Sequence, residues 1–256
     1  LSQRNAKHLY MKDYSTLKEL IAIDSPTGYT QNASNYIFDL LTNYGYKPQY
    51  TNKGAVKCSL GENPTVAIAA HVDTLGAIVS GIKSDGSLAF SLLGGLSLTG
   101  AEGEYVKIIS HDGTVFTGTI LLNNPSVHAN NEKEQTKRSI DAMHIRLDEE
   151  VYSEQDTRDL GIDVGDIICV DVKYQELANG YIKSRFLDNK AGCYVLFELA
   201  KRLKEQGKEL PVELVFSNYE EVGHGGAGGY SPTIKELLVI DMGVLGDACQ
   251  GNEVSC

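Results

Sequence analysis

The spacing of apolar residues predicts two amphipathic helices near the start of the chain. Between about residues 10 and 46, apolar side chains recur at intervals of three and four, first as Leu17, Leu20 and Ile21. The spacing returns in a second set: Tyr36, Ile37, Leu40, Leu41 and Tyr44. The sequence Asp24-Ser-Pro-Thr-Gly28 between the two sets predicts a turn, with a helix start after it.

Shorter apolar runs predict strands. The run VAIAA at residues 66–70 is almost entirely apolar, as expected of a strand that is covered on both faces. VELVFSN at residues 212–218 and LLVI at residues 237–240 are predicted as further strands. Residues 188–206 predict a helix, with one apolar side made of Val195, Leu196, Leu199 and Leu203.

The pattern changes between Gly76 and about Lys173, where short β-prone pieces alternate with turns such as Ser84-Asp-Gly86 and His111-Asp-Gly113. A short helix is expected around residues 149–160. This texture predicts a small all-β barrel-like domain over residues 76–174. We therefore predict an α/β fold, a mixed sheet with helices on both faces, formed by residues 1–75 and 175–256.

Composition narrows the class of protein. Hydrophobic content of 42% and charged content of 22% are ordinary for a soluble globular protein. No apolar run approaches the roughly 18 residues of a membrane span, and the first residues lack the apolar core of a secretory signal. The net charge of -11 argues against a nucleic-acid partner.

The cysteines are five in number and widely spaced, without a C-x-x-C pair: Cys58, Cys169, Cys193, Cys249 and Cys256. A thiolate zinc site and a disulfide framework are both disfavoured by this pattern. A reducing cytoplasm is the simplest interpretation, and we expect a cytoplasmic protein.

Five polar residues lie beside the ends of the predicted elements. His71 follows the first strand, Glu220 and Glu221 follow the second, Asp241 follows the third, and Asp188 opens the helix. Because ligands of open α/β sheets bind outside the carboxyl ends of the strands, we expect these side chains to converge. One histidine with several carboxylates is the composition of a metal site.

Each residue also has an ordinary interpretation. In His71-x-Asp73 the two side chains of an extended segment share a side, so Asp73 can orient the imidazole of a metal-ligating His71. The alternative is a histidine satisfied in a turn, with Asp73 as a nearby cap. Asp188 alone is typical of a helix N-cap, and Asp241 alone of a strand-end turn.

Paired glutamates are usually a solvated face, but Glu220 and Glu221 follow an apolar strand and precede a glycine-rich segment. Because adjacent side chains diverge, one can bind a metal while the other faces the bound water as general base. A dinuclear hydrolytic site needs a carboxylate bridging two metals roughly 3.5–4 Å apart, flanking ligands and a base. The joint pattern can fill all of these roles.

Four motifs together resemble the glutamyl aminopeptidase family of co-catalytic metallopeptidases, some of whose members carry an endoglucanase label. In chain order they are Ala70-His-Val-Asp-Thr-Leu-Gly76, Phe186-Leu-Asp-Asn-Lys-Ala-Gly192, Tyr219-Glu-Glu-Val-Gly223 and Val239-Ile-Asp-Met242. The β-rich insertion also resembles that family, and the likeness runs from about Leu17 onward.

The resemblance implies a role for each site residue. His71 and Asp241 would bind one metal, Asp188 would bridge, and Glu221 would bind the second metal. Glu220 would be the general base, and Asp73 would orient His71. The family also implies two divalent ions per subunit, zinc or cobalt, with manganese also compatible. Short peptides as substrates and a homo-oligomer, often a hollow shell, are implied as well.

The chain departs from the family pattern at two places. Thr74 stands where many members have Glu directly after the His-x-Asp motif. No histidine follows Asp241, although the family completes the second metal with a late histidine. We therefore expect a chain truncated at its C-terminus, with the second metal one ligand short; His224 is a poor substitute because its flanks are glycine-rich.

Other functions stay open. The same metal chemistry would serve an amidohydrolase or deacylase of N-acyl amino acids, and the missing histidine allows a truncated, non-catalytic member that binds metal incompletely. A cellulase is disfavoured, because glycosidases use a carboxylate pair without this metal cluster.

Overall fold

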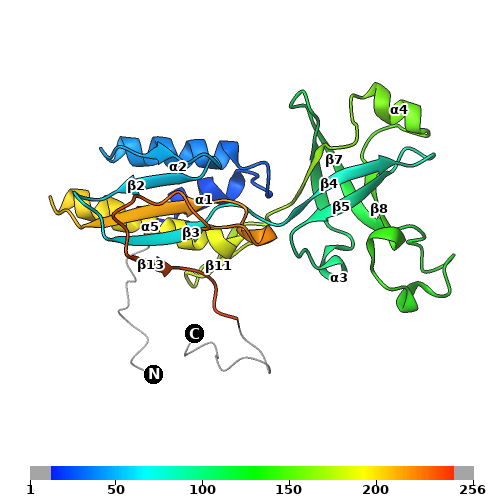
Figure 1. Cartoon of the computed structure of the whole chain (residues 1–256). Helices are drawn as coiled ribbons and strands as arrows, with labels where there is room; N and C mark the ends of the chain where they lie inside the picture. The colour runs from blue at the N-terminus through cyan, green and yellow to red at the C-terminus, as the bar shows by residue number, and fades with distance from the viewer. Residues whose placement is uncertain (1–12, 245–256) are drawn as a thin grey trace, which may run out of the picture.

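The apolar runs at residues 66–70, 212–218 and 237–240 form strands of one sheet, which lies beside a closed barrel (Figure 1). The computed structural model describes residues 13–244. The predicted fold class, an α/β unit interrupted by a small all-β barrel, is confirmed.

The sheet has five strands in the order β1-β2-β12-β3-β13. Strand β3 is central and runs parallel to both of its neighbours, while β12 is antiparallel to β2. The register sets Ser217 of β12 opposite His71, and Val239 of β13 opposite Ala69. The strands are β1 (Gln49–Tyr50), β2 (Val56–Ser59), β3 (Val66–His71), β12 (Val212–Ser217) and β13 (Glu236–Val239).

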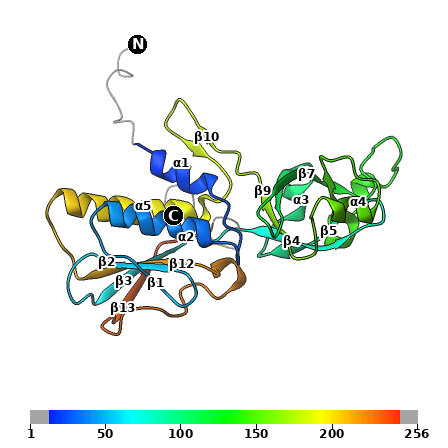
Figure 2. The same ribbon diagram turned by 90° about the horizontal axis from the view of Figure 1, so that it is seen from above.

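Helices α1 (Ser15–Ala22), α2 (Gln31–Asn43) and α5 (Leu187–Glu205) lie on one side of this sheet (Figure 2). The two amphipathic helices predicted near the start of the chain are confirmed, and their buried faces include Leu20 and Ile37. Helix α5 packs its apolar side on β3 and β12, where Phe197 stacks against Phe216 with ring centroids 5.1 Å apart.

The opposite face of the sheet is covered differently in the part of the chain that the structure describes. Ala67, Ala69 and Val215 are buried there against Tyr230 and Ile234, which belong to the loop between β12 and β13. Within residues 13–244, the helices that pack on the sheet lie on its other face.

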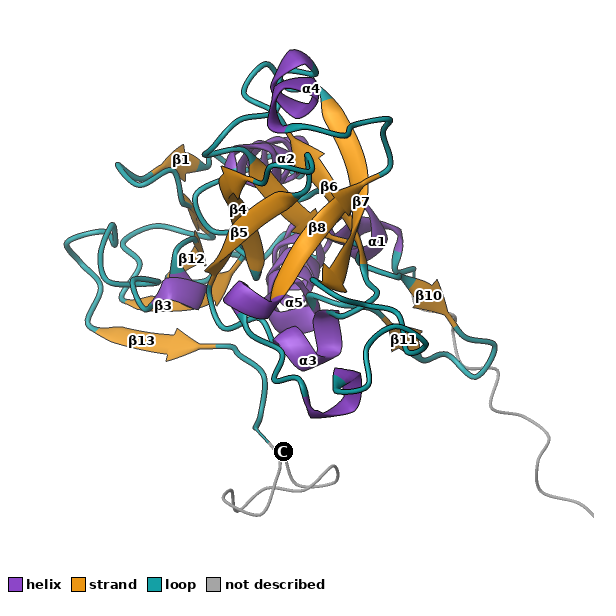
Figure 3. Cartoon of the chain, turned by 90° about the vertical axis from the view of Figure 1, so that its right-hand side faces the viewer, coloured by secondary structure: helices purple, strands orange, loops and turns teal. Residues whose placement is uncertain are grey.

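The barrel is closed in the order β4-β5-β8-β7-β6-β9 and faces the viewer in Figure 3. Side chains that alternate along the strands fill its interior, among them Phe90, Ile108 and Ile120. Its strands are β4 (Gly76–Ile82), β5 (Leu88–Leu93), β6 (Tyr105–Ile109), β7 (Val115–Leu122), β8 (Met143–Leu147) and β9 (Ile167–Val170).

Short elements connect the barrel strands and join the barrel to α5. The helix expected around residues 149–160 is α4 (Glu154–Asp159). Ser153 is its N-cap, and the Ser153 hydroxyl accepts the N–H of Asp156. The others are α3 (Leu98–Ala101), η1 (Lys133–Gln135), η2 (Ile140–Ala142), β10 (Gln175–Glu176) and β11 (Ile182–Lys183).

The cysteines within the described range, Cys58, Cys169 and Cys193, are buried and unpaired. Cys249 and Cys256 lie outside the described residues. Among residues 13–244, no helix has the length and apolar character needed to cross a membrane.

Candidate metal centre

The carboxyl ends of three parallel strands meet at one edge of the sheet. His71 is the last residue of β3, and Ser217, the last residue of β12, lies opposite it. The chain leaves β12 through Tyr219, which has a positive φ of 68°, into the turn η3 (Glu220–Val222). Asp241 follows closely after the end of β13. The parallel pairing of the strands therefore brings residues from distant parts of the sequence together at this edge of the sheet.

The first turn of α5 brings Asp188 to the same edge. Phe186 precedes the helix with a positive φ of 61°, and Asp188 itself is still outside helical geometry, with φ −77° and ψ 106°. Asn189, fully buried, donates to the carbonyl of Ile240 at 2.7 Å and accepts the N–H of Gly192 at 3.1 Å. These bonds fix the start of α5 against the end of β13.

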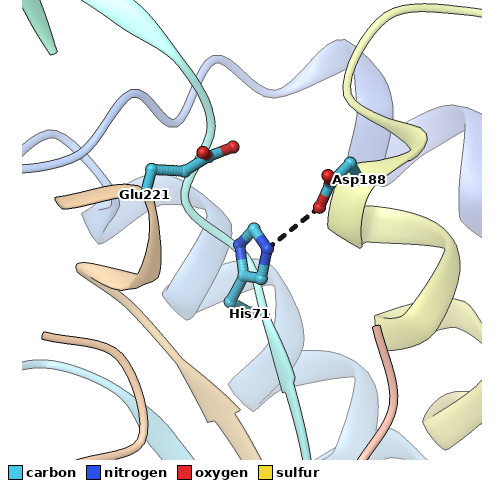
Figure 4. Close-up of side chains that lie close together, drawn as sticks. All are labelled: His71, Asp188 and Glu221. Atoms are coloured by element: carbon cyan, nitrogen blue, oxygen red, sulfur yellow. Dashed lines mark hydrogen bonds and ion pairs between the residues drawn. The ribbon is translucent and has the colours of Figure 1, made fainter. Parts of the chain in front are cut away.

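The imidazole of His71 is at the centre of the cluster. Its Nε2 lies 3.1 Å from Asp188 Oδ1, 3.5 Å from Glu220 Oε2 and 4.0 Å from Asp241 Oδ1. Figure 4 shows Asp188 and Glu221 on either side of the ring. One ligand atom from each of His71, Asp188 and Glu221 lies within 4.8 Å of the other two.

The side chains around His71 differ in their access to solvent. His71 itself is buried, whereas the side chains of Asp188, Glu220 and Asp241 are 58%, 45% and 37% exposed. A cavity of about 170 Å³ adjoins them, lined by His71, Glu220 and Asp241 among others. The carboxylates can therefore be reached by a small ion, by water and by a substrate.

Asp73 lies behind the imidazole and differs in detail from the sequence-based expectation. Its backbone carbonyl oxygen is 3.0 Å from His71 Nδ1, closer than its carboxylate oxygen Oδ1 at 3.5 Å. Both the backbone and the side chain of Asp73 therefore face this nitrogen, whereas the expectation concerned the side chain alone. A proton on Nδ1 directed at this carbonyl leaves Nε2, which faces Asp188 and Glu220, as the nitrogen that could bind a cation.

The carboxylate of Asp73 has additional partners. Oδ1 accepts the backbone N–H of Glu220 at 3.1 Å, and Oδ2 accepts that of Glu221 at 3.2 Å. The hydroxyl of Thr27 donates to Oδ2 at 2.7 Å. Sequence reasoning missed Thr27 and Asn189, although Thr27 belongs to the predicted turn and Asn189 directly follows Asp188.

The pKa shifts follow from burial and crowded charge. Burial lowers the pKa of His71, but its hydrogen bond to Asp73 and the charges of Asp73 and Glu220 outweigh this and raise it to about 9. Burial raises the pKa of Glu221 to about 7; His71 opposes this, whereas Asp188 and Asp73 add to it. Burial raises the pKa of Asp73, yet bonds from His71, Thr27 and the Glu220 backbone lower it below its usual value.

The donor set fits a divalent cation. Burial is the main cause of the raised pKa of Glu221, and the repulsion between carboxylates held around one imidazole adds to it. Nitrogen and oxygen donors of these types suit zinc, cobalt or manganese. His224 is exposed and lies outside the group of ligand atoms formed by His71, Asp188 and Glu221 among the described residues.

Known proteins are similar in sequence to this chain over most of its length. The family model of the M42 glutamyl aminopeptidases matches residues 54–255, a range that contains every predicted site residue. YhfE of Bacillus subtilis strain 168, which carries a provisional aminopeptidase name, is 39% identical over 249 residues. The protein named glutamyl aminopeptidase in Lactococcus lactis subsp. cremoris strain MG1363 is 30% identical over 230 residues.

A solved structure has the same arrangement of elements. It is the crystal structure of a TET aminopeptidase from the marine sediment archaeon Thaumarchaeota archaeon SCGC AB-539-E09, with 26% identity and a TM-score of 0.80 over 93% of this chain. The two relatives by sequence match 95% and 85% of this chain. In the other direction, the chain spans 72% of YhfE, 62% of the Lactococcus protein and 67% of the archaeal chain.

Proposed function

The chain belongs to the M42 glutamyl aminopeptidase family, and from this premise we propose that it removes N-terminal residues from peptides in a metal-dependent reaction. Members of this family are hydrolases that act on peptides. The observation that carries the proposal is the group of ligand atoms from His71, Asp188 and Glu221, with Glu220 Oε2 3.5 Å from the same imidazole nitrogen.

Two divalent ions per subunit are proposed, zinc or cobalt, with manganese also compatible. His71 and Asp241 would hold one ion, Glu221 would hold the other, and Asp188 would bridge them. Bound there, the ions would polarise the scissile carbonyl and lower the pKa of a water molecule. The approach of Asp188 and Asp241 to the same nitrogen, at 3.1 and 4.0 Å, supports this assignment.

Glu220 is proposed as the general base. Its side chain is 45% exposed at the edge of the cavity, so it can take a proton from water and deliver that proton to the departing amine. Asp73 supports this role indirectly, because its carboxylate holds the backbone N–H of Glu220 while its carbonyl faces His71. The base and the imidazole are thus fixed by one residue.

The wider assignments are proposals of the same kind. Residues 1–75 and 175–256 would form the catalytic domain and residues 76–174 the inserted barrel domain, in agreement with the strand order. Short peptides would be the substrates, and the chain would work within a homo-oligomer. The buried free thiols of Cys58, Cys169 and Cys193 support a reducing, cytoplasmic location.

Paired substrate assays test the function. The purified protein, supplied in turn with Zn²⁺, Co²⁺ and Mn²⁺, is assayed on a panel of aminoacyl-p-nitroanilides and on N-acetyl amino acids. We expect hydrolysis of the anilides, its loss with a chelator, and two metal equivalents per chain by elemental analysis. Activity on the N-acetyl compounds alone would identify a deacylase instead. Less than one metal equivalent with no hydrolysis would identify a non-catalytic member.

A further inference from the structure

The turn predicted at Asp24–Gly28 lies behind the metal centre and contacts it through one hydroxyl. We propose that Thr27 is a positioning residue, whose hydroxyl fixes the Asp73 carboxylate and thereby the backbone of Glu220 and Glu221. The proposal rests on the proposed function for its catalytic consequence. Its structural part concerns the chain alone.

The hydroxyl of Thr27 makes the shortest of the hydrogen bonds to this carboxylate. It donates to Asp73 Oδ2 at 2.7 Å, while the two backbone donors lie at 3.1 and 3.2 Å. Thr27 is 5% exposed and Asp73 is 0% exposed, so water cannot readily replace the hydroxyl. A buried carboxylate offers about four acceptor positions, and the Thr27 hydroxyl occupies one of the two on Oδ2.

Backbone hydrogen bonds hold the turn around Thr27 in place independently of its hydroxyl. Its N–H donates to the carbonyl of Thr74 at 3.2 Å, and the N–H of Thr74 donates to the carbonyl of Ser25 at 2.9 Å. Pro26 forms an isolated parallel bridge with Thr74. The turn therefore runs alongside the chain that follows β3, and the hydroxyl reaches Asp73 from a fixed position.

The barrel also helps to hold the turn that contains Thr27 in place. Lys107 on β6 is hydrogen-bonded and paired with the carboxylate of Asp24, at the start of the turn. The turn is therefore held by the barrel at one end and meets Asp73 at the other.

Loss of the Thr27 hydroxyl would affect the site through the hydrogen bonds that the Asp73 carboxylate accepts. Asp73 Oδ2 accepts only two donors among the described residues, Thr27 and the N–H of Glu221. Without the hydroxyl, Oδ2 keeps only the Glu221 N–H, so the carboxylate is less constrained about its last side-chain bond and both backbone donors at the start of η3 have a less fixed acceptor. The distance from the proposed base Glu220 to the proposed metal ligands is then less well fixed.

The test uses two substitutions and a matched control. Thr27→Val removes the hydroxyl and preserves the branched shape, whereas Thr27→Ser retains a hydroxyl. Thr157→Val is the control, because the Thr157 hydroxyl is also buried and donates at 2.7 Å, to the carbonyl of Gly86 inside the barrel domain. The readouts are kcat and KM on an aminoacyl-p-nitroanilide, amide hydrogen exchange of residues 218–222, and the absorption spectrum of the Co²⁺-loaded protein.

We expect Thr27→Val to lower kcat by about 10- to 100-fold, with KM changed less than about twofold, as for residues that support metal ligands. Amide exchange at residues 218–222 should rise and the Co²⁺ spectrum should change. Thr27→Ser should recover kcat to within about threefold of the parent. Thr157→Val should lower stability while leaving kcat, the exchange of residues 218–222 and the spectrum unchanged.

Unchanged kcat and exchange in Thr27→Val would overturn the proposal, as would a Thr27→Ser variant as impaired as Thr27→Val. If Thr27→Val does not fold, Thr27→Ala carries the same comparison, because it adds no methyl group facing Asp73. If the parent protein hydrolyses no peptide, the proposed function fails. The exchange and spectral measurements then still decide whether Thr27 positions η3.

Discussion

Asn189 donates a hydrogen bond from its side-chain amide to the backbone carbonyl of Ile240, with 2.7 Å between the two atoms. The two residues are the immediate neighbours of Asp188 and Asp241, both proposed as metal ligands. One hydrogen bond therefore sets the distance between the start of α5 and the end of β13.

Replacing Asn189 by Ala should weaken both stability and metal binding. The change leaves the carbonyl of Ile240 and the N–H of Gly192 without their partner, and we expect unfolding to become easier by about 1–3 kcal/mol. Urea denaturation and Co²⁺ titration measure the two effects. The control is Asn179→Ala, because Asn179 is exposed and its side chain accepts the backbone N–H of Tyr181 in a local turn of the barrel connection. Equal metal affinity in both variants would contradict the linking role of Asn189.

Gly192 allows α5 to approach β3 closely. A Cβ atom at this position would lie 2.1 Å from Asn189 Oδ1 and 3.2 Å from Ala70 Cβ. We expect Gly192→Ala to lower the free energy of unfolding by about 1–3 kcal/mol and to displace the first turn of α5. Gly95→Ala is the matched control, since a Cβ there meets nothing within 4 Å. Similar denaturation midpoints for the two variants would show that the helix can shift without penalty.

Glu220→Gln should retain metal but lose turnover. The amide preserves the size of the side chain yet cannot take a proton from water, so we expect kcat to fall by about 100- to 10,000-fold. Elemental analysis and steady-state kinetics check the two statements together. Glu150→Gln, at an exposed position of the barrel domain, should leave both unchanged. A Glu220→Gln variant with the full rate would assign the base to another residue.

The metal-free protein should become less stable as pH rises. Glu221 has its pKa raised from 4.5 to about 7 in the folded state, so the folded chain keeps a proton that the unfolded chain has lost within this window. Stability is therefore lost between about pH 4.5 and about pH 7. The raised pKa of His71 acts in the same direction. The stability that it gives the folded chain is fully present below pH 6.5 and is lost as the pH rises through about 9.

Thermal melts in a chelator across this pH range measure the effect. We expect Glu221→Gln to reduce the loss of melting temperature at the acidic end of the range. The loss at higher pH, which is caused by His71, should remain. A divalent metal should also reduce the loss at the acidic end, because the cation takes the place of the proton on Glu221. Identical pH profiles for the parent and Glu221→Gln would contradict the raised pKa.

The convergence of side chains at the strand ends was predictable, because parallel pairing aligns the carboxyl ends of strands whatever separates them in sequence. His71, Glu220, Glu221 and Asp241 follow apolar runs that the periodicity identifies. The helix predicted over residues 188–206 likewise corresponds to α5, Leu187–Glu205.

The supporting contacts were not predictable in the same way. The partner of Thr27 lies 46 positions away and that of Asn189 lies 51 positions away, so no local pattern marks either residue. The carbonyl oxygen and the carboxylate of Asp73 both approach His71 Nδ1, at 3.0 and 3.5 Å, and the two-residue spacing does not indicate which of them lies closer. Such distances are set by the packing of the whole sheet and have no signature in spacing or composition.

The place of β12 in the sheet has a consequence for the order in which the protein is made. β12 lies between β2 and β3, yet the whole barrel precedes it in the chain. During synthesis β2 and β3 emerge without the strand that joins them, whereas the barrel strands arrive in one continuous stretch. We expect the barrel to close first and the sheet to form only after β12 has been synthesised, since strands that are far apart in the sequence pair slowly. The edge that carries the proposed metal ligands is then among the last parts of the molecule to take shape.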